Sequence, residues 1–247
     1  MIRVRGLSKQ YSRGTWALDE VSLDIADGEF VALIGPSGAG KSTFLRCLNG
    51  LVSPTSGEVA VDGLTVTGAP EERLREIRAR VGFVFQQFNL LRRLSVLDNV
   101  LVGRLAVASR WRSLLGWFGA SDVARARDAL ARVGLDGLTD RRADTLSGGQ
   151  QQRVAIARAL VQAPRVLVAD EPMASLDPAL SRTVMDLLRR INREDGITVI
   201  TSLHVLELAR DYGRRVIALR DGRVAHDGPP ESLTPHAARL VFGDAPA

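Results

Sequence analysis

Short apolar runs and stretches of helical periodicity alternate along the chain, which predicts an α/β protein. Apolar runs typical of buried parallel strands occupy residues 30–34, 81–85, 165–169 and 197–200. Before them, residues 3–62 contain strand patterns separated by glycine turns, which indicates an antiparallel β-subdomain at the N-terminus. Between residues 89 and 160 the strand patterns disappear and apolar residues recur at helical spacing, which indicates an inserted α-helical subdomain.

This pattern predicts one domain over residues 1–247 with three parts. Residues 1–88 and 163–235 form the catalytic core with the β-subdomain, residues 89–162 form the helical subdomain, and residues 236–247 form a C-terminal tail. Within the core we expect an edge strand over Gly57–Gly63 that ends in an Asp-Gly turn, a helix over Pro178–Glu194, and a hairpin over Val216–His226. No internal repeat is evident in the sequence.

A glycine-rich segment after the first apolar run matches G-x-x-x-x-G-K-[ST] without a mismatch. It consists of Gly35, Pro36, Ser37, Gly38, Ala39, Gly40, Lys41, Ser42 and Thr43. In such a loop the backbone N–H groups face phosphate oxygens, the lysine reaches the β- and γ-phosphates, and the Ser hydroxyl binds Mg²⁺. Of the 33 basic residues only Lys9 and Lys41 are lysines. The chain is therefore expected to bind a nucleotide with Mg²⁺.

Three later segments indicate what the nucleotide is used for. A second anion-binding helix N-terminus is predicted at Leu146, Ser147, Gly148, Gly149 and Gln150. The apolar run 165–169 delivers Asp170 and Glu171 to the carboxyl edge of the sheet, where ligands bind in open α/β folds. His204 follows the apolar run 197–200 and is expected at the same edge, whereas His226 and His236 read as solvent-facing.

In the order and spacing of these motifs the chain resembles the ATP-binding cassette (ABC) family, the nucleotide-binding subunits of ABC transporters, from about Ile2 to Leu233. The resemblance implies an α/β P-loop NTPase fold of the ABC type and ATP hydrolysis with Mg²⁺. It also implies that Glu171 is the general base, that Asp170 holds Mg²⁺ through water, and that His204 contacts the γ-phosphate. A mixed Asp-Glu pair suits this chemistry, because the cation keeps one acid ionised while the other accepts a proton.

The same resemblance implies four further roles. Tyr11 would stack on adenine, although an ordinary surface aromatic residue remains the alternative. Gln86 would touch Mg²⁺ and the attacking water, with Gln87 beside it leaving the register open. Ser175, Leu176 and Asp177 would form the D-loop, which communicates across a dimer. The segment Ser147–Gln150 would close over ATP held by a second copy, so a head-to-tail homodimer is expected.

Composition agrees with a cytoplasmic protein. Hydrophobic residues make up 45% and charged residues 25% of the 247, as in ordinary globular proteins, and no run is long enough for a membrane helix. The start of the chain lacks an apolar signal segment, and the single Cys47 excludes an internal disulfide and is expected to pack as a small apolar group. The net charge of +5 permits binding to anions, but the arginines are spread along the chain without interleaved aromatics, so no specific nucleic-acid site is expected.

Two functional classes fit the motifs: the ATPase of a membrane transporter, or a soluble ABC ATPase acting on nucleic acid or translation. One cassette without a heptad run or cysteine cluster favours transport, with signalling to cell-wall machinery left open. Residues 86–101 and 171–178, with the extra stretch 103–119, most resemble phosphonate-import subunits; phosphate, polar amino acid and lipoprotein-release systems are alternatives. The implied partners are permease subunits and, indirectly, an extracytoplasmic solute-binding protein, at the cytoplasmic face of the membrane.

The stretch Gly103–Gly119 is expected to dock onto the membrane partner. It contains Trp111, Trp117 and Phe118, although aromatics make up only 5% of the chain. Exposed tryptophan and arginine are favoured interface anchors. Packing of these aromatics within the helical subdomain is the alternative, because apolar helical faces usually form core.

Overall fold

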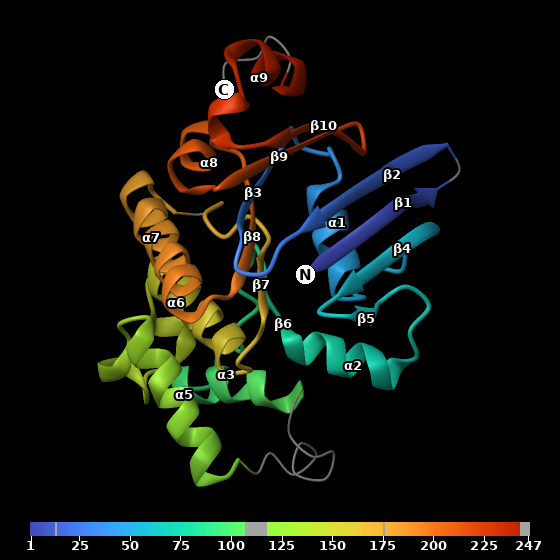
Figure 1. Cartoon of the computed structure of the whole chain (residues 1–247). Coiled ribbons are helices and arrows are strands. Elements are labelled where there is room, and N and C mark those ends of the chain that lie inside the picture. Colours follow the sequence, from blue (N-terminus) through green and yellow to red (C-terminus); the bar gives the residue numbers. More distant parts are fainter. Residues whose placement is uncertain (13, 107–117, 175, 243–247) are drawn as a thin grey trace.

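The computed structural model describes residues 1–12, 14–106, 118–174 and 176–242, which form two sheets covered by helices (Figure 1). The larger sheet has six strands in the order β10-β9-β3-β8-β7-β6, and the smaller has four in the order β2-β1-β4-β5. The predicted α/β fold with a mainly parallel sheet and an N-terminal antiparallel unit is confirmed.

The six-stranded sheet is parallel except for β10, which pairs antiparallel with β9. Every residue of β3, β6, β7 and β8 is buried, as expected for strands covered on both faces. The last of these strands is longer than predicted, because it continues through polar residues to Leu203. The strands are β3 (Phe30–Ile34), β6 (Val81–Val84), β7 (Val166–Ala169), β8 (Thr198–Leu203), β9 (Arg215–Arg220) and β10 (Arg223–Gly228).

The four-stranded sheet is antiparallel and consists of β1 (Ile2–Ser12), β2 (Thr15–Ile25), β4 (Ser56–Val61) and β5 (Leu64–Thr65). The prediction that residues 57–63 form an edge strand is wrong, because β4 pairs on one side with β1 and on the other with the two-residue β5. The predicted Asp-Gly turn does follow β4, and both of its residues have positive φ angles, 48° at Asp62 and 77° at Gly63. Asp-Gly tolerates this left-handed backbone well.

Helices cover both faces of the central sheet. Between residues 89 and 160 the described residues form helices and no strand, apart from a single bridge between Ser95 and Arg142. None of the described helices is long and apolar enough to cross a membrane. The α-helices are α1 (Lys41–Leu48), α2 (Glu71–Arg80), α3 (Val96–Val102), α5 (Ala120–Arg132), α6 (Gly148–Leu160), α7 (Pro178–Asp195), α8 (Leu206–Tyr212) and α9 (Pro235–Phe242). The 3₁₀ turns are η1 (Gly103–Ala106), η2 (Asp136–Leu138), η3 (Ala143–Thr145) and η4 (Pro230–Ser232).

Two hydrophobic cores lie on opposite faces of the central sheet. Along β3 the side chains alternate, so that Phe30, Ala32 and Ile34 belong to the core under α3, α5, α6 and α7. Val31 and Leu33 face the other core, between the central sheet, α1 and the antiparallel sheet. The predicted apolar packing of Cys47 is confirmed: the thiol is buried in this second core, and burial raises its pKa to about 11.

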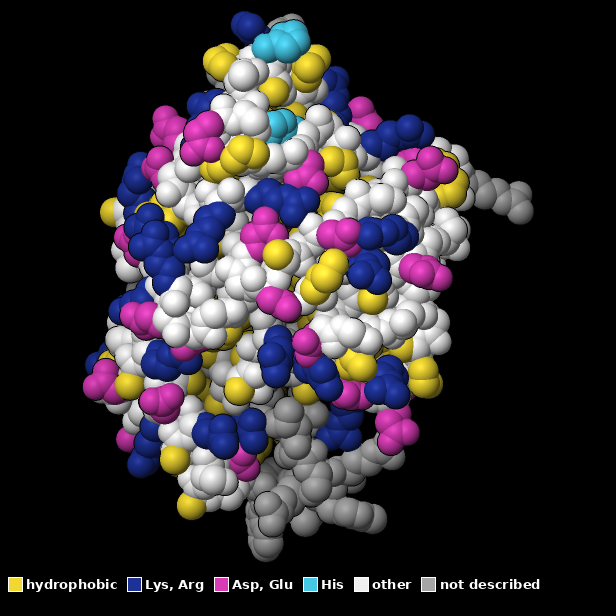
Figure 2. Space-filling view, viewed as in Figure 1, with side chains coloured by type: hydrophobic (Ala, Val, Ile, Leu, Met, Phe, Trp, Pro, Cys, Tyr) yellow, Lys and Arg dark blue, Asp and Glu magenta, His cyan; other side chains and the backbone are white. Residues whose placement is uncertain are grey.

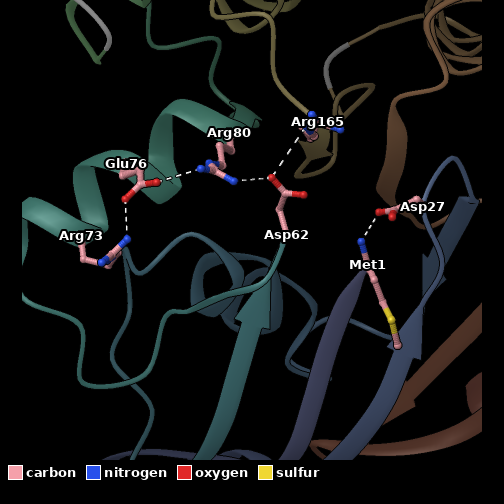
Figure 3. A network of polar contacts seen from close by, with 7 residues as sticks. All are labelled: Met1, Asp27, Asp62, Arg73, Glu76, Arg80 and Arg165. Atoms are coloured by element: carbon pink, nitrogen blue, oxygen red, sulfur yellow. Dashed lines mark hydrogen bonds and ion pairs between the residues drawn. The ribbon is translucent and has the colours of Figure 1, made fainter.

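Away from the phosphate loop, a chain of ion pairs joins α2 to both sheets (Figure 3). Arg80 contacts Asp62 at 2.7 Å and Glu76 at 2.8 Å, Glu76 also contacts Arg73, and Asp62 reaches Arg165 before β7 at 3.8 Å. Such partly exposed pairs each contribute little. Figure 2 shows acidic and basic side chains interspersed over the face in view, in line with a general excess of arginine.

Candidate nucleotide site

The glycine-rich loop joins the buried strand β3 to the N-terminus of α1, as predicted. Two of its glycines have no substitute. A Cβ on Gly35 (φ 147°) would lie 2.2 Å from the carbonyl oxygen of Leu219, and one on Gly40 (φ 100°) 2.2 Å from that of Ala17. Close backbone approach and left-handed angles together therefore require glycine at both positions. By contrast, Gly38 (φ 81°) faces open space.

This loop encloses a cavity of about 420 Å³. The lining residues are Ala17, Ser37, Gly38, Ala39, Gly40, Lys41, Ser42, Thr43 and Glu171. Backbone N–H groups at a helix N-terminus favour an anion in such a cavity. The loop and the acid that follows β7, which are far apart in sequence, thus form one site.

Lys41 is the buried cation of this site, with 4% of its surface exposed. Its Nζ donates hydrogen bonds to the carbonyl oxygens of Gly35 at 2.7 Å and Pro36 at 3.0 Å. Burial lowers the pKa of Lys41, and the carboxylates of Glu171 and Asp170 oppose that shift. The ammonium is therefore held in position beside the cavity by the loop's own backbone.

Strand register explains why residues far apart in sequence meet at this edge. Val84 of β6 pairs with Ala169 of β7, which pairs with Thr201 of β8. Gln86 and Glu171 thus each lie two residues beyond a paired position. On the other side of β8, Leu203 pairs with Ile34 of β3, so that His204 and Gly35 follow a pair directly.

Asp170 is buried, with 1% of its surface exposed, and is surrounded by donors. Its Oδ1 accepts hydrogen bonds from Ser42 Oγ at 2.8 Å and Ser202 Oγ at 3.2 Å, and its Oδ2 lies 3.5 Å from Arg46 Nη2. A hydroxyl and a carboxylate in contact are the kind of oxygen donors through which proteins hold Mg²⁺ beside phosphates. Ser42 and Asp170 therefore fit the predicted metal role, although no cluster of three or more His, Cys, Asp or Glu occurs among the described residues.

Glu171 and His204 contact each other at the end of the central strands. His204 Nε2 lies 2.6 Å from Glu171 Oε1, and the backbone N–H of Glu171 donates to Ser202 Oγ at 2.8 Å. Glu171 has a left-handed backbone with φ 47°, which is unfavourable for a residue with a side chain. The surrounding contacts hold this conformation, and Glu171 lines the cavity at Lys41, whereas His204 does not. The two residues thus meet, as the strand-end positions predicted.

Tyr11 lies beside the loop in an exposed position. Its hydroxyl is 3.4 Å from Thr43 Oγ1 of α1, and the ammonium of Lys9 lies 5.2 Å from its ring centroid. With 61% of its surface exposed, the ring is accessible to a planar ligand. Its stacking on adenine stays a prediction.

Gln86 and its neighbour Gln87 are both exposed in a turn after β6. The turn is closed by the N–H of Phe88, which donates to the carbonyl of Phe85 at 3.2 Å. This geometry places both glutamines at the carboxyl edge and leaves the choice between them open. The role of Gln86 toward Mg²⁺ and water remains a prediction.

The second predicted anion site lies at the N-terminus of α6. Ser147 caps this helix: its Oγ accepts from the N–H of Gln150 at 3.3 Å, and the Gln150 side chain accepts from the N–H of Ser147. Ser147 and Gly148 are exposed, whereas Leu146 and Gly149 are buried. None of these residues lines the cavity at Lys41. The structure therefore does not bring the two anion sites of one chain together.

Only two of the three residues predicted to form the D-loop can be compared with the structure, because Ser175 lies outside the described residues. Leu176 packs against the core under α3, α5, α6 and α7. Asp177 caps α7, since its Oδ1 accepts from the N–H groups of Ala179 at 3.0 Å and Leu180 at 2.9 Å. Communication across a dimer stays a prediction, and capping is a local function of Asp177 that the sequence interpretation missed.

Two other contributors were also missed. Ser202 bridges Asp170 and the backbone of Glu171, and Arg46 of α1 reaches Asp170 from the other side. A serine within an apolar strand is a signal that could have identified Ser202. No local pattern distinguishes Arg46 from the other arginines.

The predicted docking stretch is described only at its ends, since Trp111 and Trp117 lie outside the described residues. Phe118 is half-buried and packs against the helical core, which favours the core interpretation for this ring. His226 is also not freely solvent-facing as predicted. It is half-buried, and its Nε2 lies 3.2 Å from Ser232 Oγ.

Comparisons with known proteins follow the same motifs. Residues 18–174 match the family model described as ABC transporter. The phosphonates import ATP-binding protein PhnC of Bdellovibrio bacteriovorus is 50% identical over 245 residues, which cover 99% of this chain and 94% of that protein. PhnC 2 of Cupriavidus necator is 53% identical over 246 residues, covering 98% of this chain and 87% of that protein.

Solved structures agree in fold. The dimeric, post-hydrolysis ATP-binding cassette MJ0796 bound to ADP and Pi has a TM-score of 0.82 and 38% identity, covering 93% of this chain and 99% of that one. The protein cbiO1 from Clostridium perfringens, part of the transporter complex cbiONQ, has a TM-score of 0.83 and 35% identity, with coverages of 94% and 89%.

Proposed function

Because the chain belongs to the ABC transporter family, we propose that it hydrolyses ATP to drive a membrane importer for phosphonates. The observation that carries the ATPase assignment is the cavity shared by the glycine-rich loop and Glu171. In that cavity a buried lysine, a helix N-terminus and a carboxylate lie together, as phosphoryl transfer to water requires.

The residues divide the chemistry between them. Lys41 and the loop N–H groups bind the β- and γ-phosphates, while Ser42 and Asp170 would hold Mg²⁺, Asp170 through water. When bound, Mg²⁺ supplies positive charge that neutralises the phosphates. Glu171 accepts a proton from the attacking water. His204, whose Nε2 lies 2.6 Å from Glu171 Oε1, orients that carboxylate and would contact the γ-phosphate. Tyr11 would stack on adenine, and Gln86 would touch the metal and the water.

The proposed working unit is a head-to-tail homodimer. Ser147–Gln150 offers anion donors at the end of α6, yet none of these residues lines the cavity of its own chain. A second copy would place this segment over the phosphates, with Leu176 and Asp177 between the sites. The similar cassette with ADP and Pi is dimeric, which supports this arrangement.

The solute and membrane partners follow from the relatives and not from any residue of this site. Several relatives about 50% identical over nearly the full chain are named phosphonates import ATP-binding proteins. The chain would work as a peripheral subunit at the cytoplasmic face of the membrane, bound to permease subunits. An extracytoplasmic binding protein would deliver the solute to that permease.

The solute assignment is tested with the transporter reconstituted in liposomes from this chain, its permease and its binding protein. We expect a phosphonate-loaded binding protein to stimulate ATP hydrolysis, because solute reaches the ATPase only through the partners. Inorganic phosphate and polar amino acids serve as matched solutes. Stimulation by one of these and not by phosphonate would contradict the phosphonate assignment and leave the ATPase assignment in place.

A further inference from the structure

Arg158 lies near the C-terminal end of α6 and donates to the turn that carries Gln86. Its Nη1 donates to the carbonyl oxygen of Asn89 at 2.6 Å, and its Nη2 donates to that of Phe88 at 2.7 Å. One guanidinium thus bridges two consecutive carbonyl groups. The fixed fork of arginine is suited to such two-point contact, which a lysine could not reproduce.

The backbone at this contact is unusual. Phe88 and Asn89 are consecutive non-glycine residues with positive φ angles, 55° and 50°. The left-handed conformation is unfavourable for a bulky residue such as Phe88 and better tolerated by Asn89, so neighbouring contacts must hold Phe88 in it. The same Phe88 closes the turn over Gln86 and Gln87 through its N–H bond to the carbonyl of Phe85. The position of Gln86 therefore depends on a strained pair of residues that Arg158 fixes.

Burying the charged guanidinium of Arg158 is unfavourable unless its hydrogen bonds compensate for the lost solvation. Burial lowers its pKa, and among the described residues no carboxylate pairs with it. The carbonyl dipoles of Phe88 and Asn89 thus stabilise its charge. The main chain also packs closely on α6 at this point, because a Cβ on Gly103 would lie 2.2 Å from the carbonyl oxygen of Arg158.

We propose that Arg158 is a positioning residue for Gln86 and couples it to the anion-binding end of α6. This role rests on the proposed function of Gln86 toward Mg²⁺ and the attacking water. Ser147 and Arg158 lie at the two ends of one helix, about 16.5 Å apart along its axis at 1.5 Å per residue. A rigid helix with these ends would pass a change at the second copy's nucleotide to the turn that carries Gln86.

The test compares Arg158→Met with Arg153→Met in the full chain. Arg153 is a matched control: it lies on the same helix and also donates to two carbonyl groups, of Val133 at 3.1 Å and Gly134 at 3.4 Å, away from Gln86. We expect Arg158→Met to lower kcat about ten-fold and to raise the Mg²⁺ concentration for half-maximal rate, because misplaced catalytic groups lose rate. Affinity for metal-free ATP should stay unchanged. Arg153→Met should keep both kinetic values.

A double-mutant cycle with Gln86→Ala separates positioning from general stability. If Arg158 acts through Gln86, the double variant should be no slower than Gln86→Ala alone, since coupled residues are not additive. Arg158→Lys, which keeps the charge but reaches one carbonyl at a time, should give an intermediate kcat, and this variant carries the test if Arg158→Met fails to fold.

Three results would overturn the inference. The first is an equal kcat for the Arg158 and Arg153 variants, and the second is multiplication of the Arg158 and Gln86 effects in the double variant. The third is a normal rate for Gln86→Ala beside a slow Arg158→Met, which would mean that Arg158 acts by another route. Failure of the proposed function has a different signature, namely an absence of ATP hydrolysis by the wild-type chain.

Discussion

Replacing Glu171 by Gln should abolish nearly all ATP hydrolysis while leaving Mg-ATP bound. The amide keeps the shape of the side chain but cannot accept a proton from water, and loss of a general base costs about 10²- to 10⁴-fold in rate. Binding should persist because Lys41 and the loop backbone supply the phosphate contacts. Steady-state hydrolysis and nucleotide binding by calorimetry, measured on the same preparation, check both expectations.

Glu58→Gln is the matched control, since Glu58 is an exposed acid on β4, outside the nucleotide cavity. It should hydrolyse ATP at the wild-type rate. A Glu171→Gln variant that turns over near the wild-type rate would remove Glu171 from the mechanism, and His204 would then become the candidate base.

Lys41→Ala should lose most of the affinity for nucleotide. A hydrogen bond to a charged group contributes about 1.5–3 kcal/mol, which corresponds to roughly 10- to 100-fold in Kd. The reason is specific to this lysine, because its ammonium is buried beside the cavity and already held by two loop carbonyls. Calorimetric titration with ATP measures the change.

The other lysine of the chain provides the control. Lys9 donates to the carbonyl oxygen of Ser53 at 2.7 Å and lies over Tyr11, outside the cavity. Its replacement by Ala should change Kd by a few-fold at most. Thermal unfolding shows whether both proteins are folded. If they are, equal ATP affinity of Lys41→Ala and wild type would contradict the assigned phosphate contact.

The phosphate loop and the strand ends could be predicted because their signals are local. Gly35–Thr43 is one continuous motif, and the acids follow directly on an apolar strand. Pairing between strands is not local, so the pattern of residues 57–63 could not show that β4 lies between β1 and β5. The predicted strand at residues 197–200 ends too early for a related reason. Thr201 and Ser202 of β8 are polar residues, and only the tertiary fold shows that they are buried.

Contacts that depend on the tertiary fold also could not be predicted from the sequence. Ser202 and Arg46 reach Asp170 only because β8 and α1 lie beside the end of β7. Arg158 could not be separated from the many other arginines until its contacts with Phe88 and Asn89 were known. The same holds for the aromatic stretch, because the sequence pattern around an apolar ring such as Phe118 is the same whether the ring packs in the core or lies in an interface.

The division into a core, a helical subdomain and a tail remains a prediction, although the helical character of the described part of 89–160 agrees with it. Its functional consequence is the separation of the two anion sites. One chain holds the phosphate loop beside Glu171 and presents Ser147 at a different place. A complete nucleotide site therefore requires a second copy of the chain in the proposed mechanism.

The composite nucleotide site can be tested by measuring the ATPase rate per molecule of the purified chain as a function of protein concentration. If ATP is hydrolysed between the phosphate loop of one copy and Ser147–Gln150 of another, the rate per molecule should fall on dilution and reach a plateau at high concentration. The extent of dimerisation, measured by sedimentation in the same buffer, should have its midpoint at the same protein concentration as the ATPase rate. A rate per molecule that stays at its full value after dilution to monomers would contradict the composite site.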